Sequence, residues 1–410
     1  MNIKLFIALI LLTIVNGKVS DDIFKLGFSM LKSLNCSNRS TLFSPLATYA
    51  SLTRIYLGAR GETKRNLEKI VFGTSDPKEI TFYYEQLYQK MHYGKAFDLV
   101  NQIYFDKSLE DAVTDKYDQE STNLHFSSAE FPNFKSNSKK EIRKINEFFS
   151  ASTNKTIFRD VLTENDVDNI TMISLVNAFF MDGEVAQSPF LGDTEYYTRR
   201  LRGPQTFHGL DGDRKVLMML GETQLSDFYD HSLYTYGTWQ YGFTYNGKRP
   251  ETQLRYWSKQ LWLYIIVPKE NVTLSSLIES FTNGSLEPPK VFGKYRYRGY
   301  LDIKMPPISF ESHTELTPVL ESLGLNLSDM DLSGMFRNES IGKNLTIKSI
   351  KQAAKVDIRK KNPGVPALQT TPPGLTLVSR AQPEISMTAD RPFIFGMFLN
   401  NTQILLGTYV

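Results

Sequence analysis

One segment of the sequence combines glycine and lysine in a pattern that can bind phosphate. Residues 242–248, GFTYNGK, match most of a phosphate-binding loop, in which glycines let backbone N–H groups approach phosphate oxygens and the lysine supplies charge. Arg249 stands where the motif needs Ser or Thr, however, and Pro250 follows where a helix should begin. The segment therefore does not predict a nucleotide site.

Patterns for hydrolysis and metal binding are also missing from the sequence. A nucleophilic serine of the α/β-hydrolase type needs a Gly-x-Ser-x-Gly turn, and no such run occurs. The histidines do not have the spacing of zinc ligands. We therefore predict that the chain is not an enzyme and that it holds no metal and no cofactor. The five histidines are His92, His125, His208, His231 and His313.

The N-terminus has the composition of a secretory signal peptide. Lys4 precedes an apolar run from Leu5 to Val15, and Asn16 and Gly17 follow it. A basic start, a short apolar stretch and a small residue predict a signal peptide over residues 1–17, cleaved after Gly17. The alternative is a membrane anchor, but a spanning helix needs about 20 apolar residues. We therefore expect a secreted, extracellular protein without a membrane partner.

Ten Asn-x-Ser/Thr acceptors support the extracellular setting. The triplet recurs by chance, but ten in one chain is a high number and predicts a glycoprotein. The lone Cys36 has no partner for an internal disulfide, so we expect an inert or glycan-shielded thiol rather than an intermolecular bridge. The acceptors are Asn35, Asn38, Asn154, Asn169, Asn271, Asn283, Asn326, Asn338, Asn344 and Asn400.

Two segments are basic enough to bind a polyanion. Residues 294–300, KYRYRGY, alternate basic and aromatic side chains, which suits RNA or a sulfated sugar but also describes a strand with one basic solvent-facing side. Lys355, Arg359, Lys360 and Lys361 form the second segment. The net charge of +3 does not indicate a nucleic-acid partner. If either segment binds a polyanion, we expect a glycosaminoglycan, because the chain is secreted.

The elements that carry these residues change character along the chain. Apolar residues at helical spacing follow Asp21 and Asp22, and a second helix begins at Ser44 and Pro45. A third helix runs to Gly73. The first third of the mature chain is therefore mostly helical, and 41% hydrophobic residues suffice for a large core.

Strands dominate the second half of the sequence. Short β-rich runs cover residues 97–105, 172–181, 261–267 and 300–305, each bounded by turn residues. At the C-terminal end, apolar residues 393–395 and 404–406 flank Asn400 and Asn401, which predicts a hairpin. No linker divides the chain, so we predict a single domain over residues 18–410.

One long segment carries no helical or strand pattern. Residues 359–383 are rich in Pro, Gly and Thr over more than twenty positions. A structureless loop of that length inside a compact domain usually carries function. We therefore expect this loop to be the functional part of the molecule.

The sequence resembles the serpin family. Residues 387–397, MTADRPFIFGM, satisfy the C-terminal signature of that family at every defined position. The remaining similarities extend over essentially all the mature chain, in the family's order. They are Ser44-Pro45, Leu57 to Gly61, Asn101 to Tyr104, Ile145-Asn146, Leu175 to Ala178, Leu301 to Pro306, Leu323-Gly324 and Asp331 to Gly334.

The resemblance implies an α+β serpin fold with three β-sheets, about nine helices and an exposed reactive-centre loop at residues 359–383. It also implies a partner, an extracellular serine protease that attacks the loop. In inhibitory members the cut loop inserts into the central sheet before the acyl-enzyme is hydrolysed, so the protein is consumed and is not a catalyst. We expect a monomer.

The first part of the loop departs from the inhibitory pattern. Family inhibitors place small residues there, because small side chains enter a crowded sheet quickly. Proline has no N–H and is confined to edges and bulges in sheets, so two prolines should obstruct insertion. A barrier higher by about 2–3 kcal/mol slows insertion roughly thirty- to over a hundredfold. The aligned hinge is Lys360, Lys361, Asn362, Pro363, Gly364, Val365 and Pro366.

Other positions that the resemblance assigns are partly changed. Val185 replaces the family's Trp, and Ser40 replaces an Asn. Ser44 and Asn177, the shutter residues of the family, are retained. They either hydrogen-bond in the core or take part in a conformational switch.

The scissile bond is not fixed by the sequence. Counting from the hinge reaches Thr376 and Leu377, whereas counting back from Phe393 reaches Arg380 and Ala381. Arg380 suits the acidic pocket of a trypsin-like protease, although an arginine on a solvated loop needs no such role. Two functions follow: a non-inhibitory or substrate-like serpin, or a working inhibitor that uses a longer loop in a shifted register.

Overall fold

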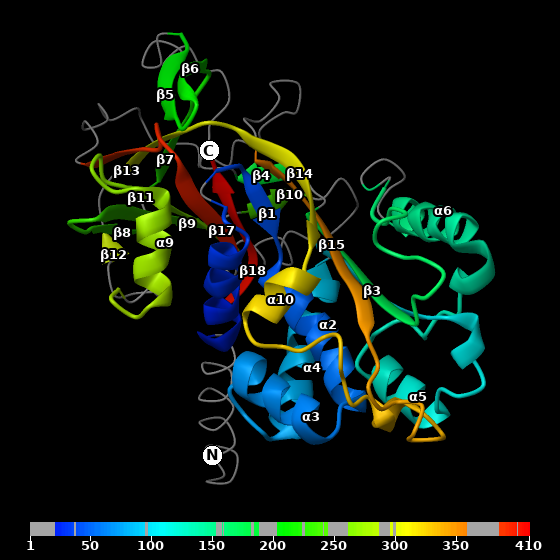
Figure 1. Ribbon diagram of the computed structural model, residues 1–410. Coiled ribbons are helices and arrows are strands. Elements are labelled where there is room, and N and C mark those ends of the chain that lie inside the picture. Colours follow the sequence, from blue (N-terminus) through cyan, green and yellow to red (C-terminus); the bar gives the residue numbers. More distant parts are fainter. Residues whose placement is uncertain are drawn as a thin grey trace.

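Figure 1 presents the structure, a computed structural model of the whole chain. The part described below consists of residues 21–36, 38–94, 97–152, 158, 160–181, 184–187, 203–223, 226–240, 242–244, 261–286, 296–297, 301–358, 385–399 and 401–410.

The N-terminal part of the described chain is helical, as predicted. Residues 21–33 form a helix whose apolar stripe, Ile23, Leu26 and Met30, is buried. Helix α2 (Pro45–Gly58) begins with Ser44 as its N-cap, and the Ser44 hydroxyl accepts a hydrogen bond from the N–H of Ala47. A capping hydroxyl and a proline in the first turn both favour this start. Almost every residue of α2 is buried, so this helix lies inside the molecule.

The remaining helices lie around the sheets. The third helix predicted from the sequence is α3 (Gly61–Leu67), continued by the π-helical turn η1 (Glu68–Phe72) and ended by Gly73 at φ +58°. Together with residues 21–33, the described chain holds eight α-helices. The others are α4 (Pro77–Gly94), α5 (Asp115–Asn123), α6 (Phe134–Ser152), α9 (Leu274–Thr282) and α10 (Thr317–Ser322), with short 3₁₀ turns η2 (Lys107–Leu109) and η3 (Ser333–Met335).

A four-stranded sheet occupies the centre of the molecule. Its order is β14 (Ile308–Glu315), β15 (Ile347–Ile358), β3 (Ile173–Met181) and β2 (Phe97–Phe105). Strands β15 and β3 run parallel, and the other neighbours are antiparallel. Strands β2 and β3 match the predicted runs to within one residue, because both are rich in β-branched and aromatic residues.

A seven-stranded sheet contains the predicted C-terminal hairpin. Strands β17 (Phe393–Leu399) and β18 (Thr402–Tyr409) pair antiparallel with each other. The sheet order is β1, β18, β17, β11, β9, β8, β12. The other bounds are β1 (Thr41–Phe43), β11 (Leu261–Pro268), β9 (Tyr234–Gln240), β8 (Ser226–Asp230) and β12 (Arg296–Tyr297).

Smaller sheets complete the architecture. A three-stranded sheet has the order β16 (Ile385–Thr388), β13 (Leu301–Met305) and β7 (Met219–Thr223). Two ribbons pair β5 (Gln205–Gly209) with β6 (Gly212–Val216), and β4 (Glu184–Gln187) with β10 (Gly242–Thr244). Strand β10 begins the segment that resembles a phosphate-binding loop, and residues 245–248 of that segment lie outside the described residues.

Two apolar clusters form the core. The larger cluster contains residues from Ile23 to Leu406. It includes side chains of the seven-stranded sheet and side chains of the central sheet, where the two sheets pack together. The smaller one lies between α6 and the central sheet and includes Ile142, Val176 and Ala353. Within the described part of the chain, no helix has the length and apolarity that crossing a membrane requires. The same residues contain no group of acidic, His or Cys side chains arranged for a metal ion.

Candidate functional site

The parallel boundary between β3 and β15, named the seam here, is the candidate functional site. Eight residue pairs align across it, from Ile173 opposite Ile347 to Phe180 opposite Lys355, with a register shift after Ile347. Strand β15 leads directly into the long loop, and residues 359–384 separate its end from the start of β16. A strand added to the centre of this sheet has to enter at the seam. The seam is closed over its whole paired length.

Three amide side chains lie side by side across the seam on its inner face. Asn101 of β2 is opposite Asn177 of β3, which is opposite Gln352 of β15. The Asn101 amide nitrogen donates to Asn177 Oδ1 at 2.5 Å. All three side chains are buried, with exposures of 6% or less. The sheet register therefore builds a row of buried amide groups, named the polar row here, on the inner face of the sheet.

Helix α2 supplies the hydroxyl groups that this row needs. Ser44, Thr48 and Ser51 are spaced by four and three residues, so they share one face of the helix. The Ser51 hydroxyl donates to Asn177 Oδ1 at 2.5 Å and accepts from the Asn101 amide at 2.7 Å. Side-chain hydrogen bonds thus join this part of the helix to the sheet.

Gln352 joins the start of α2 to strand β15. Its Oε1 accepts from the Ser44 N–H at 2.6 Å, and its amide donates to the Ser44 carbonyl at 3.1 Å and to Thr48 Oγ1 at 3.3 Å. The Ser44 hydroxyl also donates to the Ile404 carbonyl of β18 at 2.7 Å. Ser44 therefore connects the central sheet to the seven-stranded sheet.

The polar row is incompletely hydrogen-bonded. Asn101 Oδ1 and Asn177 Nδ2 are buried and have no hydrogen-bond partner among the residues that the structure describes. Each buried unpaired polar atom costs about 1–3 kcal/mol, because it has lost water without gaining a partner. Separating β3 from β15 uncovers the edge of β3 that carries Asn177, so Asn177 Nδ2 gains access to new partners. The row therefore makes the closed seam less stable than an apolar layer of the same size.

The outer face of the seam is covered by α6 and the segment that follows it. Residues 160–172, named the return segment, connect α6 back to β3. The Asn146 side chain fixes this segment to α6, because its amide donates to the Leu162 carbonyl and its Oδ1 accepts from the Leu162 N–H, both at 2.9 Å. Any strand that enters the seam has to displace this cover.

Ion pairs hold the return segment against β15. Lys351 Nζ lies 2.7 Å from Asp166 Oδ1 and 3.6 Å from Glu315 Oε2, and Lys351 and Asp166 are largely buried. Lys348 Nζ lies 3.3 Å from Asp168 Oδ2. Although burial raises the pKa of Asp168, its hydrogen bonds with Thr171 and the Ile170 N–H and the nearby Lys348 together lower it below the usual value. Both pairs bridge from β15 to the segment that precedes β3.

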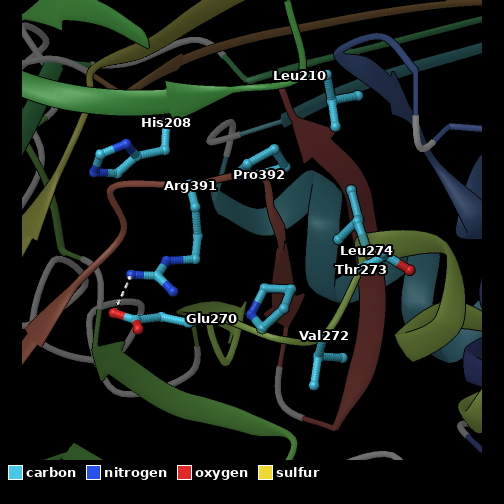
Figure 2. Close-up of a pocket in the computed structure, with 9 residues that line it drawn as sticks. His208, Leu210, Glu270, Val272, Thr273, Leu274, Arg391 and Pro392 are labelled. Atoms are coloured by element: carbon cyan, nitrogen blue, oxygen red, sulfur yellow. Dashed lines mark hydrogen bonds and ion pairs between the residues drawn. The ribbon is translucent and has the colours of Figure 1, made fainter. Parts of the chain in front are cut away.

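The far anchor of the loop contains a hollow. Strand β16 pairs parallel with β13, and the chain then turns through Asp390 and Arg391. Arg391 Nε donates to Asp390 Oδ1 at 2.9 Å, and its Nη2 lies 3.4 Å from Glu270 Oε1. Figure 2 shows Arg391 beside His208 at the polar end of this hollow, with Val272 at the apolar end. Its volume is about 450 Å³. These contacts fix the chain just after the loop.

The structure places some of the predicted site residues and not others. Ser44 and Asn177 are fully buried. Both belong to the polar layer, which is the polar row together with the α2 side chains that bond to it, yet they do not bond to each other. The whole hinge, residues 360–366, and the candidate bonds at Thr376, Leu377, Arg380 and Ala381 lie outside the described residues. So do parts of both basic segments, although Lys355 is a half-buried residue of β15 and Arg296 belongs to β12.

The glycosylation acceptors that the structure describes are all exposed. Asn154 and Asn400 lie outside the described residues. Exposure is necessary for glycan attachment and does not prove it, so occupancy stays a prediction. The exposed acceptors are Asn35, Asn38, Asn169, Asn271, Asn283, Asn326, Asn338 and Asn344.

Cys36 is shielded by burial. Its side chain is 1% exposed, and no disulfide is formed. Burial raises the pKa of the thiol to about 11, against smaller lowering effects of Thr41 and Arg39. The thiolate, which is the reactive form, is therefore scarce at neutral pH.

Sequence reasoning missed most of the polar layer. Ser51 and Thr48 carry a usable signal, since they repeat the Ser44 position at helical spacing on a helix that was predicted. Asn101 and Gln352 carry none, because their alignment with Asn177 depends on strand register, which a single sequence does not reveal. The Lys351–Asp166 pair joins segments that are far apart in the sequence, so the sequence alone does not predict it either.

Comparison with known proteins decides the family. The family model described as "Serpin (serine protease inhibitor)" matches residues 22–409. The chain belongs to the serpin family. An uncharacterized serpin-like protein of Thermococcus kodakarensis is 24% identical to it over 388 residues, covering 92% of this serpin and 82% of that protein. The leukocyte elastase inhibitor of Equus caballus is 24% identical over 381 residues, with 89% and 91% covered.

Solved structures agree on the serpin fold. An Arabidopsis serpin in the native stressed conformation matches with a TM-score of 0.74 at 19% identity, covering 96% of this chain and 98% of that one. Uncleaved ovalbumin matches with a TM-score of 0.73 at 20% identity, with the same coverage. The fold predicted from the sequence is therefore confirmed.

Proposed function

We propose that this serpin is a secreted, glycosylated protein that presents its loop as a cleavable or binding segment and does not trap proteases. The observation that carries the proposal is the pair Pro363 and Pro366 in the aligned hinge. The loop has to enter the seam, where a new strand is flanked by β3 on one side and β15 on the other. Such a central strand donates backbone N–H groups to its neighbours, and proline has none.

The environment of the seam adds a second obstacle. Successive residues of a strand point to opposite faces, so of Lys360 and Lys361 one faces the inner layer on α2 and the other faces the cover by α6. Apart from the polar row on the inner face, the side chains that line these two layers are mostly apolar. A buried ammonium group without a partner is costly, so the two lysines disfavour insertion in either register.

The extracellular setting rests on the N-terminal segment and on the acceptors. Residues 1–17 have the pattern of a signal peptide, and the eight described acceptors are exposed. An extracellular serine protease is then the partner that cleaves or recognises the loop. The serpin acts as a monomeric binder or substrate and not as a catalyst.

The proposal is tested with one trypsin-like and one chymotrypsin-like protease. We expect cleavage within residues 359–384, no SDS-resistant covalent complex, and no rise in thermal midpoint after cleavage. A serpin that inhibits the same protease serves as the positive control in each reaction. An SDS-resistant complex at near-stoichiometric yield rules the proposal out.

The second candidate is a working inhibitor with a longer loop. It is favoured by the retained polar layer, which lowers the cost of opening the seam, and by Arg380 as a residue for a trypsin-like pocket. This candidate requires a covalent complex with the trypsin-like protease that disappears in Arg380→Ala. Cleavage without a complex and without a gain in thermal stability excludes it.

A further inference from the structure

A hollow of about 270 Å³ lies between α6 and strand β2 of the central sheet. Two residues of β2, residues 130–132 and one side of α6 line it. Backbone hydrogen bonds attach the middle segment to β2, because the Glu130 N–H donates to the Ile103 carbonyl at 3.2 Å and the Glu130 carbonyl accepts from the Phe105 N–H at 2.9 Å. The hollow is therefore formed by a helix and by hydrogen-bonded backbone.

Each of these three segments contributes an aromatic ring to the hollow. Tyr104 belongs to β2, Phe131 to the middle segment and Phe148 to α6. Tyr104 is 4% exposed, whereas Phe148 is 43% exposed. The face of an aromatic ring carries negative charge density and attracts a cation that lies within about 6 Å of the ring centre. Rings from three separate segments around one hollow therefore favour a cationic ligand.

Two carboxylates line the same hollow. The side chain of Glu141 is 12% exposed, and its Oε1 lies 2.9 Å from Lys144 Nζ. Among the residues that the structure describes, Glu130 has no cationic side chain within ion-pair distance. Burial raises the pKa of Tyr104, and the Glu130 carboxylate raises it further, so this carboxylate lies near a ring of the hollow. Two carboxylates and one ammonium leave the described lining with an excess of negative charge.

Lys144 supplies the ammonium group that a ligand has to replace. Its side chain is 58% exposed, and it lies three residues from Glu141 on the same helix. Exposed ion pairs of this kind contribute little to stability, so exchange for another cation costs little. Gln102 does not compete for the carboxylates, because its amide N–H groups donate to the Ser128 and Ile103 carbonyls at 2.7 and 3.3 Å.

We propose that this hollow binds the quaternary ammonium group of a small organic cation, of which choline is the simplest example. A quaternary ammonium has no N–H group to donate, so ring faces and opposite charge recognise it rather than hydrogen bonds. The three rings remove its methyl groups from water, and Glu130 and Glu141 balance its charge. The site is independent of the proposed function, because its described lining contains no residue of the seam strands β3 and β15.

The lining disfavours two other kinds of ligand. A calcium ion takes six to eight oxygen ligands, and the hollow offers two carboxylates among rings and aliphatic groups. A neutral apolar molecule would take both carboxylates out of water without supplying a partner, which is costly. A cation with an apolar surface avoids both problems.

Ligand titration by saturation-transfer NMR tests the site on the full, uncut chain. We expect choline to bind with a Kd on the order of 1 mM, as suits a ligand of few atoms. Dimethylbutanol, in which a carbon atom replaces the choline nitrogen, has the same shape without the charge. It should bind at least about tenfold more weakly.

Matched variants assign the binding to the rings and the carboxylates. Phe148→Leu and Glu130→Gln should each weaken choline binding roughly fivefold or more. Both side chains are at the surface, so the variants should fold normally, which an unchanged thermal midpoint without ligand checks. Phe82→Leu and Glu339→Gln remove an equally exposed ring and an exposed acid elsewhere and should leave the Kd unchanged.

Lys144→Gln gives the opposite expectation. Because it removes the competing ammonium group, it should tighten choline binding about twofold to fivefold. Lys140→Gln is its control, since Lys140 is exposed one helical turn earlier and does not line the hollow. Its effect should be smaller.

Vesicles of phosphatidylcholine distinguish a lipid headgroup from a free ligand. Flotation of wild type, but not of Phe148→Leu, with these vesicles assigns the headgroup, and choline binding without flotation assigns a soluble molecule. Either result supports the hollow as the site.

Four results overturn the proposal: no choline binding by the wild type, equal binding of choline and dimethylbutanol, equal losses in Phe148→Leu and Phe82→Leu, or equal gains in the Lys144 and Lys140 variants. No protease is used. Failure here is therefore distinguishable from failure of the proposed function.

Discussion

At the scale of single residues, buried polar groups control how the centre of this serpin is held together. Ser44 connects α2, β15 and β18 through its hydroxyl and its backbone, while Asn101 and Asn177 each retain an unpaired atom. A fully satisfied network would stabilise the closed seam, and a partly satisfied one lowers the cost of opening it. The residues that permit opening are thus present, whereas we expect the aligned hinge to obstruct insertion.

Cys36 gives a residue-scale prediction with a defined pH dependence. Its pKa of about 11 means that roughly one thiol in a thousand is ionised at pH 8, so native protein should react slowly with iodoacetamide. The rate should rise about tenfold per pH unit toward pH 11. Because burial favours the neutral thiol in the folded state, its contribution to stability is complete below about pH 9 and is lost as the pH rises toward 11.

Mass spectrometry of alkylated protein checks this expectation. Protein unfolded in guanidinium chloride is the control, since its thiol should react at the ordinary rate. Complete labelling of the native protein within minutes at pH 8 contradicts the prediction.

At the scale of elements, the cover over the seam depends on contacts between distant segments. The Lys351–Asp166 pair and the Asn146–Leu162 hydrogen bonds attach the return segment to β15 and α6. Apolar packing under α6 adds to them. The stability of the closed seam is therefore partly set outside the sheet.

Asp166→Asn should loosen this cover. Removing one partner of a largely buried ion pair leaves Lys351 with only the longer Glu315 contact, so we expect a loss of about 1–3 kcal/mol. Hydrogen exchange should become faster in residues 160–172, and the thermal midpoint should fall.

Glu164→Gln is the matched control for that variant. It removes an exposed ion pair to Lys139 in the same segment, and exposed pairs contribute about 0–1 kcal/mol. Equal exchange rates in both variants would show that the buried pair does not hold the return segment.

The sequence predicts the helices and strands better than it predicts the contacts between them. Strands β2, β3 and β11 were predicted almost to the residue, because each is an apolar run bounded by turn residues. The fold and the pair Ser44 and Asn177 followed from the family resemblance. Partners such as Gln352, and the bridge between Lys351 and Asp166, depend on register and on long-range packing, which no local pattern encodes.

At the scale of the whole molecule, the central sheet and the loop that follows β15 have opposite effects on insertion of a new strand. The seam contains unpaired polar atoms that favour opening, while we expect the hinge sequence to disfavour entry of a new strand. The outcome after cleavage depends on which effect is larger. We propose that proline decides this balance, because a missing backbone donor cannot be restored by side-chain rearrangement.

Replacing both hinge prolines should restore insertion. We expect that cleaved wild type shows no rise in thermal midpoint, whereas cleaved Pro363→Thr, Pro366→Ala shows a rise of at least about 5 °C, as a gain of a few kcal/mol produces. Differential scanning fluorimetry before and after limited proteolysis measures this. Pro383→Ala, which lies beyond both candidate bonds, is the control and should behave as wild type. Identical midpoints for the cleaved double variant and cleaved wild type would remove the prolines as the cause.

The position of the C-terminal hairpin also has a consequence for synthesis of the protein. Strand β18 lies between β17 and β1, and it pairs Phe43 with Leu406 near opposite ends of the chain (Figure 1). While the ribosome is still translating, β1 has no strand to join, and the large apolar core cannot close. Sheets built from such distant partners form slowly. The nascent chain therefore remains exposed to aggregation until its last strands emerge, and chaperone protection is needed throughout elongation.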